Sequence, residues 1–193
     1  MKKTLSLPLS DEDVYGLKAG DIVYLSGILV TGRDEVYHRV VQEGLPCPVD
    51  LKGGANYHAG PIVRELTPGW ELVSIGPTSS VRMEKWAADF IAKTGVKVMI
   101  GKGGMGEKTT AACRAYRAVH CVYPGGCAVL GAGQIDGIEG VYWPELGMAE
   151  CLWVMRTGGF GPLIVSIDAC GNNLFAENAA HYASNSEDFI RRF

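Results

Sequence analysis

Cations and a hydroxyl gather in one stretch of this sequence, at the predicted ends of two strands. Thr78 and Arg82 follow a short apolar run that ends at Ile75, and Lys102 follows a second run, Val96–Ile100. Ligands of open α/β sheets bind beyond the carboxyl ends of the strands, where arginine and lysine hold anions. A hydroxyl among such cations can position a substrate or, if its pKa is depressed, accept a proton. The stretch therefore predicts a site for a small anion.

Two strand, loop and helix units are predicted to position these side chains. The first strand is Glu71–Ile75, which is apolar and β-branched as a buried strand should be, and Gly76-Pro77 ends it. Hydroxyls at positions 78–80 then predict the start of a helix. The second strand, Val96–Ile100, runs into a glycine-rich loop. Helix N-termini add free N–H groups and partial positive charge to such loops.

Each of these residues also has an ordinary structural explanation when it is taken alone. Thr78 fits a helix cap, Arg82 a solvated helix charge, and Lys102 a plain loop lysine. Arg33, at the junction of a predicted strand and helix, fits a helix-end arginine paired with Asp34. On the residues alone, these explanations are preferred.

Five motifs in order resemble the C-terminal domain of class I fumarases, which also occurs as a separate β subunit in two-chain fumarases and L-tartrate dehydratases. The motifs are T-G-R-D at Thr31–Asp34, Y-H-A-G-P at Tyr57–Pro61, G-P-T-S-S-V-R-M from Gly76, G-K-G-G-M from Gly101, and D-A-C-G-N-N-L-F at Asp168–Phe175. The match spans nearly the whole chain. Five ordered motifs are far more specific than any one of them.

The resemblance implies a role for each cation of the predicted site. It assigns Arg33, Arg82 and Lys102 to the carboxylates of a substrate, and it places Gly76 in the substrate-binding loop. It also makes Thr78 the catalytic base. A threonine hydroxyl is too weakly acidic to ionise unaided, so this role requires strongly positive surroundings.

Four further residues are possible members of the site. Asp34 follows the motif arginine, and His38 stands one residue later than the expected R-D-x-x-H spacing. His58 on a short strand could face the site, although a satisfied core histidine is the somewhat better interpretation. Asp168 could orient a partner, but the D-x-x-G spacing favours a structural role in a turn.

A hydro-lyase acting on a 2-hydroxy dicarboxylate must hold two carboxylates, activate the leaving hydroxyl, and remove a proton from carbon. The cations of this chain supply the first service and, by resemblance, Thr78 supplies the third. The resemblance implies that a 4Fe–4S cluster bound by an α subunit supplies the second. We therefore expect a β subunit that hydrates fumarate reversibly to L-malate with its α subunit; the alternative is an L-tartrate dehydratase β subunit.

Two other functions are weighed against this one. The run K-G-G-M-G-E-K-T at Lys102–Thr109 is similar to a phosphate-binding P-loop, but Glu107 places an acid where the loop should close on a phosphate. A nucleotide-binding protein is therefore a distant alternative. A scaffold without activity is disfavoured because Arg33, Thr78 and the other motif cations are all present.

Composition limits the class of protein, its partners and its compartment. A length of 193 residues predicts one domain, 1–193, and a 47% hydrophobic share suits a sizeable core. The net charge of −3 argues against nucleic acid, and no stretch is long enough to span a membrane. The first residues, Met1-Lys2-Lys3, are not followed by the apolar core of a signal peptide. A cytoplasmic protein is therefore expected. A homodimer is a possible state of the isolated chain, through the surface that its partner would cover.

The six cysteines are interpreted as small buried hydrophobes in a reducing compartment, since no pair has the C-x-x-C spacing of a zinc or redox site. Cys113, His120, Cys121 and Cys127 could in principle converge on a metal, but this is much the weaker interpretation. We expect no metal ligand on this chain.

About eight short strands with few helices between them predict a layered β/β/α domain of the α/β class, and the resemblance implies the swivelling β/β/α fold. Gly27, inside the strand Ile22–Val30, predicts a bulge or a close backbone approach. Other predicted elements are strands at Thr4–Leu9, Cys121–Tyr123, Cys127–Leu130, Cys151–Arg156 and Leu163–Ile167, a loop or small helix at Ala132–Gly147, and helices at Glu35–Glu43, Lys108–Val119, Glu177–Ala183 and Glu187–Phe193, the last docking Phe189 and Ile190.

Overall fold

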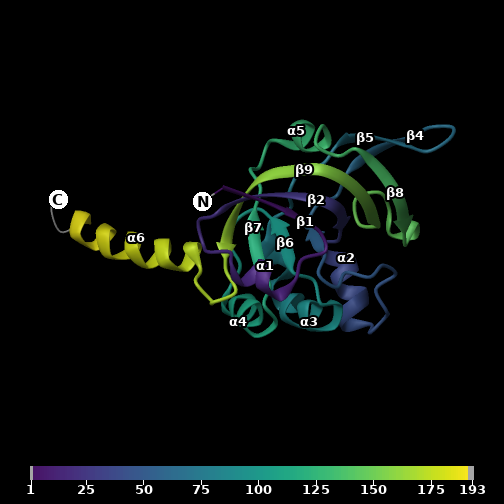
Figure 1. Ribbon diagram of the computed structural model, residues 1–193. Coiled ribbons are helices and arrows are strands. Elements are labelled where there is room, and N and C mark those ends of the chain that lie inside the picture. The colour runs from purple at the N-terminus through teal and green to yellow at the C-terminus, as the bar shows by residue number, and fades with distance from the viewer. Residues whose placement is uncertain (1, 191–193) are drawn as a thin grey trace.

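The chain folds into a mixed α/β structure dominated by one large sheet (Figure 1). The computed structural model describes the backbone of residues 2–190 and the side chains of residues 2–183. The sheet has the strand order β1-β2-β3-β6-β7-β9-β8, and β4 and β5 form a separate hairpin. The strands are β1 Lys2–Ser6, β2 Ile22–Thr31, β3 Ala55–Tyr57, β4 Ile62–Glu65, β5 Trp70–Ser74, β6 Val98–Gly101, β7 Val119–Val122, β8 Gly137–Tyr142 and β9 Leu152–Ile167.

Short helices connect these strands. They are α1 Asp11–Tyr15, α2 Asp34–Tyr37 continued by the π-helix His38–Gln42, the 3₁₀ turn Ser80–Met83 leading into α3 Glu84–Thr94, α4 Glu107–Tyr116, α5 Ala128–Ala132, the 3₁₀ turn Pro144–Leu146, and α6 Leu174–Ile190. In Figure 1, α3 and α4 lie below the sheet, whereas α5 and the β4–β5 hairpin lie above the arch of β9. No helix within residues 2–190 is long and apolar enough to cross a membrane.

The large sheet closes on itself through its longest strand. β3, β6 and β7 run parallel in the middle, β2 pairs in parallel with β3, and β9 runs antiparallel to both β7 and β2. The pairings therefore form a ring, β2–β3–β6–β7–β9 and back to β2. The carboxyl ends of β2, β3 and β6 consequently meet at one end of the ring, where the predicted site residues follow them.

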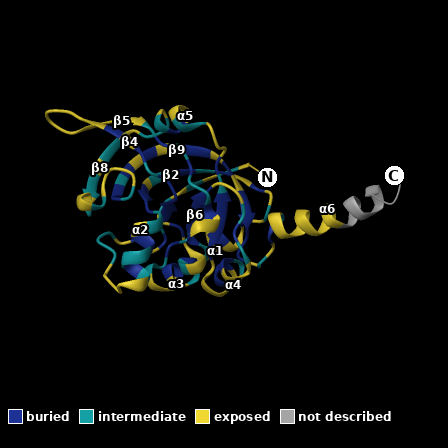
Figure 2. Cartoon of the chain, turned by 180° about the vertical axis from the view of Figure 1, so that it is seen from behind, coloured by how far each residue is buried: buried dark blue, intermediate teal, exposed yellow. Residues whose placement is uncertain are grey.

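Alternate residues of the central strands supply two separate hydrophobic cores. On β6, Val98 and Ile100 belong to the core enclosed by the sheet, together with Tyr57 and Phe160. Met99, between them, belongs to a second core with residues of α2, α3 and α4. This is the period-two alternation of a strand that is buried on both faces. Figure 2 shows the resulting buried centre beneath an exposed shell.

Gly27 confirms the prediction made for the interior of β2. Its φ is +110°, the register against β9 shifts on both sides of Leu25, and an added Cβ would lie 3.1 Å from the Leu7 carbonyl oxygen. A side chain at this position would strain the backbone, and it would also press on Leu7, the residue that follows β1.

Two elements near α5 were predicted wrongly. The segment predicted as a strand at 127–130 is the helix α5, and Val129 and Leu130 on it are 73% and 68% exposed. The segment 132–147, predicted as a loop or small helix, contains β8, which pairs with β9. Short apolar runs do not distinguish strand from helix by periodicity, and the glycines of β8 hid its pairing.

The predicted strands at 151–156 and 163–167 are the two halves of one strand, β9. The intervening Thr157–Pro162 segment, half of which is glycine, was predicted only to separate the two strands. Instead one of these glycines, Gly161, lets β9 approach its neighbour β2 closely. A Cβ on Gly161 would lie 2.8 Å from the Val23 carbonyl oxygen and 2.9 Å from Tyr24. Glycine therefore serves close packing between strands here, not a turn.

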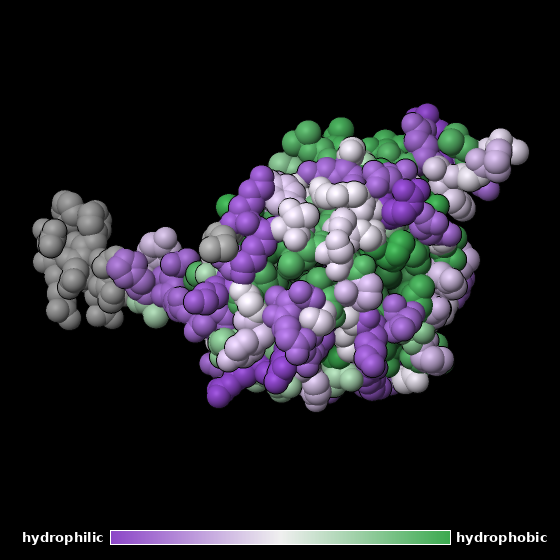
Figure 3. All heavy atoms as spheres, in the orientation of Figure 1, coloured by the Kyte–Doolittle hydropathy of each residue, from purple (hydrophilic) through white to green (hydrophobic). Residues whose placement is uncertain are grey.

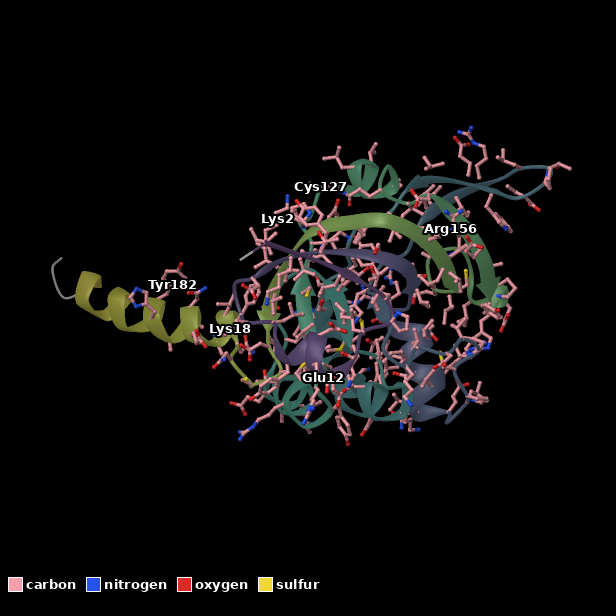
Figure 4. The ribbon with its side chains drawn as sticks, viewed as in Figure 1. Lys2, Glu12, Lys18, Cys127, Arg156 and Tyr182 are labelled. Carbon is pink, nitrogen blue, oxygen red and sulfur yellow. The ribbon has the colours of Figure 1, made fainter. Side chains whose placement is uncertain are left out.

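Two further expectations need correction. β5 lies in the two-stranded hairpin, and it is largely exposed, so the strand before the site loop is not a buried member of the main sheet. The two helices predicted near the C-terminus are one helix, α6, which extends away from the body and carries Tyr182 in solvent (Figure 4). Phe193 and the side chains of Phe189 and Ile190 lie outside the described residues.

Candidate functional site

The loop after β5 is held in place by backbone hydrogen bonds to two neighbouring segments. The Thr78 N–H donates to the His58 carbonyl at 2.6 Å, and the Thr78 carbonyl accepts from the Lys102 N–H at 3.2 Å. Ser80 N–H donates to the Lys102 carbonyl at 3.0 Å. The loop thus pairs like a strand with residues beyond the ends of β3 and β6, which brings Thr78 and Lys102 side by side.

Gly101 makes this close pairing sterically feasible. A Cβ at this position would overlap Ser80 Oγ and lie 2.9 Å from His58 Nδ1. The first glycine of the G-K-G-G-M motif is therefore required by packing against the loop, and not by an unusual backbone angle.

Two arginines and two acids form a chain of ion pairs beside this loop. Arg33 Nε lies 2.8 Å from Glu150 and 3.5 Å from Asp34. On the other side of Asp34, Arg82 places Nε at 3.0 Å and Nη2 at 2.7 Å from the two carboxylate oxygens. Asp34 therefore holds Arg33 and Arg82 next to each other, although they belong to different loops. By binding Nε and Nη2, Asp34 also determines which edge of the Arg82 guanidinium stays free for another partner.

The group keeps a net positive charge. Three cations (Arg33, Arg82 and Lys102) face two acids (Asp34 and Glu150), which leaves one positive charge. Lys102 is exposed and forms no ion pair with any residue in 2–183. The buried atoms Arg33 Nε and Asp34 Oδ2 are compensated by their ion-pair partners, Glu150 and Arg82. An anion placed beside this group would therefore meet the uncompensated positive charge of Lys102.

Two glycines of the motifs lie where the loops approach their neighbours. A Cβ on Gly60 would come within 2.9 Å of Arg33 Nη1, and a Cβ on Gly76 would lie 3.0 Å from Ala128 Cβ. The Ile75 N–H donates to the Ala128 carbonyl at 2.9 Å. Gly76 therefore packs the site loop against α5, which is how α5 comes to border the site.

The glycine loop after Lys102 is anchored by an acid that sequence reasoning missed. Glu84 accepts from Gly106 N–H at 2.8 Å, from Thr109 Oγ1 at 2.6 Å, and from Thr109 N–H at 3.3 Å. These are the free donors at the start of α4, where a P-loop would bind a phosphate. The carboxylate of Glu84 already occupies them, which argues against nucleotide binding at this loop.

Asp168 lies in a turn and not among the site cations. It accepts from the N–H groups of Ala19, Cys170 and Asn172 and from the Asn172 side chain, at 2.8–3.1 Å. Burial raises the pKa of Asp168, but these hydrogen bonds outweigh it and leave the pKa below its usual value. Asn173 in the same motif donates to the Met105 carbonyl, so the turn supports the glycine loop from outside the site.

The two candidate histidines do not join the cations. His38 begins the π-helix, where it pairs with Glu43 at 3.1 Å and meets the Trp86 ring edge-on. His58 is fully buried behind the loop, between Tyr37 Oη at 2.8 Å and Ser80 Oγ at 3.0 Å. Burial and the neighbouring His120 hold the pKa of His58 well below its usual value, so the ring is neutral.

The cysteines of this chain do not fit an iron–sulfur cluster. Among the side chains of residues 2–183, no three cysteines, histidines or acids converge as metal ligands. Cys113 and Cys121 belong to the two different cores, and burial raises the pKa of the Cys121 thiol to about 12. Cluster ligands are thiolates, whereas these cysteines are protonated.

Glu150 is a second residue that sequence reasoning missed. It follows the 3₁₀ turn after β8 and reaches Arg33 and the Glu35 N–H, at 2.8 and 3.3 Å. Its only sequence signal is an acid in a loop of an acidic protein, which carries no information about a partner in a distant motif.

Comparison with known proteins identifies the family. The family model described as "Fumarase C-terminus" matches residues 2–178. The chain is 50% identical over 190 residues to the L(+)-tartrate dehydratase subunit beta of Escherichia coli (strain K12), covering 98% of this chain and 94% of the relative. It is 40% identical over 173 residues to a putative L(+)-tartrate dehydratase subunit beta of Methanocaldococcus jannaschii, covering 88% and 89%.

A longer relative shows the same segment within a larger protein. The chain is 37% identical over 172 residues to a putative class I fumarate hydratase of Geobacillus stearothermophilus, covering 89% of this chain but 33% of that protein. The resemblance drawn from the five motifs is thereby confirmed. This chain belongs to the fumarase C-terminus family.

Proposed function

We propose that this chain is the β subunit of a two-chain L(+)-tartrate dehydratase. The observation that carries the proposal is 50% identity to such a subunit over almost the full length of both chains. This similarity favours the tartrate alternative over the fumarase function that was expected first from the motifs. The related class I fumarate hydratase is less similar, at 37% identity, so fumarate hydration stays as the second candidate.

The reaction removes water from a dicarboxylate that carries a hydroxyl on each central carbon. A proton leaves one of these carbons and hydroxide leaves the other, which yields an enol that tautomerises to a 2-oxo dicarboxylate. The two carboxylates of the substrate must be held while the carbon between them reacts. Arg82 and Lys102 are exposed cations on adjacent loops. Arg33 is linked to Arg82 through Asp34, with which both arginines form ion pairs. An arginine suits bidentate recognition of a carboxylate, and a lysine suits recognition by a point charge.

Thr78 is the proposed base. It lies between Lys102, to which its carbonyl is hydrogen-bonded, and the turn that carries Arg82. The positive charge of these side chains favours the ionised form of a hydroxyl at this position. The substrate proton would pass to Thr78 Oγ1 while the two cations keep the neighbouring carboxylate from turning away.

The leaving hydroxyl needs a Lewis acid, and the side chains of residues 2–183 form no group of metal ligands that could hold one. A 4Fe–4S cluster on an α subunit is the proposed source of that service, as the family resemblance implies. The residues of this chain then act only on the carboxylates, the proton and the orientation of the substrate. Separation of the services between chains explains why the cations lie open at one end of the fold.

Apolar side chains beside the site loops offer a surface for the α subunit. Val81, beside Arg82 in the chain, is 61% exposed. Val129 and Leu130 of α5, which follow the Ala128 that packs on Gly76, are 73% and 68% exposed. Figure 3 shows apolar atoms gathered at the top of the molecule, over α5. A partner that covers them would also enclose the substrate and exclude water.

We also propose that the layers seen here form the swivelling β/β/α fold of the family, as one domain. The ring of strands gives two sheet layers around the first core, and α2–α4 cover the second. Six free cysteines suit a reducing compartment, and we place the protein in the cytoplasm.

Co-expression with the α subunit of the same organism tests the proposal. The two chains should co-purify, and the anaerobic complex should dehydrate L-tartrate while neither chain does so alone. Iron and sulfide should accompany the α subunit when the chains are separated. Activity in this chain alone, or a complex without hydro-lyase activity, would contradict the proposal.

A further inference from the structure

Six buried polar side chains form a continuous row behind the site loop. We call them the polar row; all are fully inaccessible to solvent, and they are Asn56, Tyr37, His58, Ser80, His120 and Ser166. Tyr37 Oη lies 2.8 Å from His58 Nε2, and Ser80 Oγ lies 3.0 Å from His58 Nδ1 and 2.9 Å from His120 Nε2. His120 Nδ1 lies 2.6 Å from Ser166 Oγ. Buried polar groups need such partners, and this row satisfies its members internally.

One assignment of hydrogens satisfies every contact of the row. Ser166 donates its only hydrogen to the His120 carbonyl at 3.1 Å, so it accepts from His120 Nδ1–H. A neutral His120 then has a bare Nε2, which takes the hydroxyl hydrogen of Ser80. Ser80 in turn accepts from His58 Nδ1–H, and the bare Nε2 of His58 accepts from Tyr37.

The amide of Asn56 completes the assignment at the other end. Its nitrogen donates to Tyr37 Oη at 3.0 Å and to the Gly32 carbonyl at 3.2 Å, while its oxygen accepts from the Gly32 N–H at 3.1 Å. Amide orientation follows from the hydrogen-bond partners, and only this orientation supplies Tyr37 with a donor. The row therefore has a single direction, from Asn56 to Ser166.

The row requires both histidines to be neutral. A second N–H on either ring would face a hydrogen that Tyr37 or Ser80 already donates. Burial lowers the pKa of His120 to about 3, and burial with the neighbouring His120 lowers that of His58, so both rings keep one hydrogen at neutral pH. The tautomers are fixed by geometry, and neutrality is fixed by burial.

The row connects the two loops that carry the cations. Asn56 grips Gly32, the residue before Arg33, and Tyr37 ends the helix that begins at Asp34. Ser80 belongs to the other loop, between Thr78 and Arg82, and its backbone pairs with Lys102. The remaining members stand on β3, β7 and β9 or directly after them.

We propose that Ser80, His58 and His120 are positioning residues of the dehydratase, which set the loop of Thr78 and Arg82 in register with Lys102 and with the Arg33–Asp34 segment. Ser80 is the central member because it alone lies on the loop and bonds to both histidines. The inference rests on the proposed function, but the placement of the loop can be measured without turnover.

A matched pair of serine variants tests the proposal in the assembled enzyme. Ser80→Ala and Ser166→Ala each remove one buried hydroxyl from His120, but only Ser80 is part of the site loop. We expect Ser80→Ala to lower kcat for L-tartrate by about thirtyfold or more with KM within about threefold, and Ser166→Ala to stay within about threefold in both. Equal kcat values in the two variants at a similar loss of melting temperature would overturn the positioning role.

Two measurements on this chain are independent of activity. Nitrogen-15 NMR of the parent should show His58 and His120 as neutral Nδ1–H tautomers near neutral pH, and an Nε2–H tautomer on either ring would refute the hydrogen assignment. Amide hydrogen exchange at Thr78 and Lys102 should speed up at least tenfold in Ser80→Ala but not in Ser166→Ala. Unchanged exchange in Ser80→Ala would overturn the proposal. If the parent complex shows no turnover, the proposed function fails, while these two measurements still decide the inference.

Discussion

Arg82 holds Asp34 with one edge of its guanidinium and turns the rest of its half-exposed side chain to solvent. Removing Arg82 takes away its proposed charge-assisted contact to a substrate carboxylate and also leaves the negative charge of Asp34 without one of its ion-pair partners. We expect Arg82→Ala to lower kcat/KM of the assembled enzyme roughly 30- to 1000-fold. This corresponds to a loss of about 2–4 kcal/mol of transition-state stabilisation. Steady-state kinetics with saturating α subunit measures it.

Arg117 provides the matched control for that substitution. It is another half-exposed arginine with an aspartate partner, Asp11 at 3.5 Å, but it follows α4 and takes no part in the site. Arg117→Ala should leave kcat/KM within about threefold, since an exposed pair of this kind contributes little. A parent-like Arg82→Ala enzyme would remove Arg82 from the carboxylate-binding role.

Two substitutions test whether the hydroxyl of Thr78 acts as the base: one removes the hydroxyl and the other keeps it. Thr78→Ala should lower kcat at least about 100-fold while substrate still binds, because the carboxylate contacts come from other residues. Thr78→Ser keeps a hydroxyl and should recover part of the rate. The loop itself is held by backbone bonds, so neither change should unfold it. Normal turnover in Thr78→Ala would show that Thr78 only shapes the loop and that the base lies on the α subunit.

The start of α4 depends on an acid from the neighbouring helix α3. Glu84 satisfies two backbone N–H groups and the hydroxyl of Thr109, so Glu84→Gln should lower the unfolding free energy by about 1–3 kcal/mol. Glu107 in the first turn of α4 is exposed and serves as the control. Chemical denaturation of Glu107→Gln should show a loss within about 0.5 kcal/mol. Equal losses would mean that Glu84 acts through helix charge alone.

The sequence was sufficient for those elements whose signals are local. The Gly-Pro break at 76–77 and the glycines after β6 marked the two loops correctly, so Thr78 and Lys102 were expected at neighbouring positions. Gly27 inside β2 was likewise predicted to mark a bulge or a close backbone approach. Each of these signals comes from the residue itself or from its neighbours in the sequence.

The remaining features depend on contacts between distant segments. Glu150, Glu84 and Ser80 acquire their roles only when the ring of strands brings their partners to them. The same applies to β9, which was predicted as two separate strands because the close approach of Gly161 to β2 leaves no signal in the local pattern. Alternation and turn signals report on neighbours in sequence, and they are silent about register across a sheet.

For the whole molecule, the two buried histidines link stability to pH. Their folded pKa values lie below the usual value of about 6.5, so below about pH 6.5 the unfolded chain binds protons that the folded chain does not. The contribution of the two neutral histidines to the unfolding free energy is complete above about pH 6.5 and is lost as the pH falls towards the folded pKa values. Once both unfolded histidines are charged, the unfolding free energy should fall by about 2.7 kcal/mol per pH unit from this source.

His120→Gln isolates one histidine in that profile. The variant removes one titrating group, so the slope of unfolding free energy against pH between about 6 and 5 should flatten by about 1.4 kcal/mol per unit. A change of overall stability does not affect this slope, which makes the comparison independent of the packing lost. An unchanged slope would show that His120 is already protonated in the folded chain.

The substrate tests the central claim for the whole assembly most directly. The measurement is kcat/KM for L-tartrate and for L-malate, side by side and anaerobically, with this chain and its α subunit in one preparation. The account predicts that L-tartrate is dehydrated with the higher kcat/KM, because a relative that is 50% identical over 98% of this chain is an L(+)-tartrate dehydratase subunit beta, and one that is 40% identical over 88% is a putative one. A preference for L-malate in that preparation would contradict it and would make this chain a fumarase subunit.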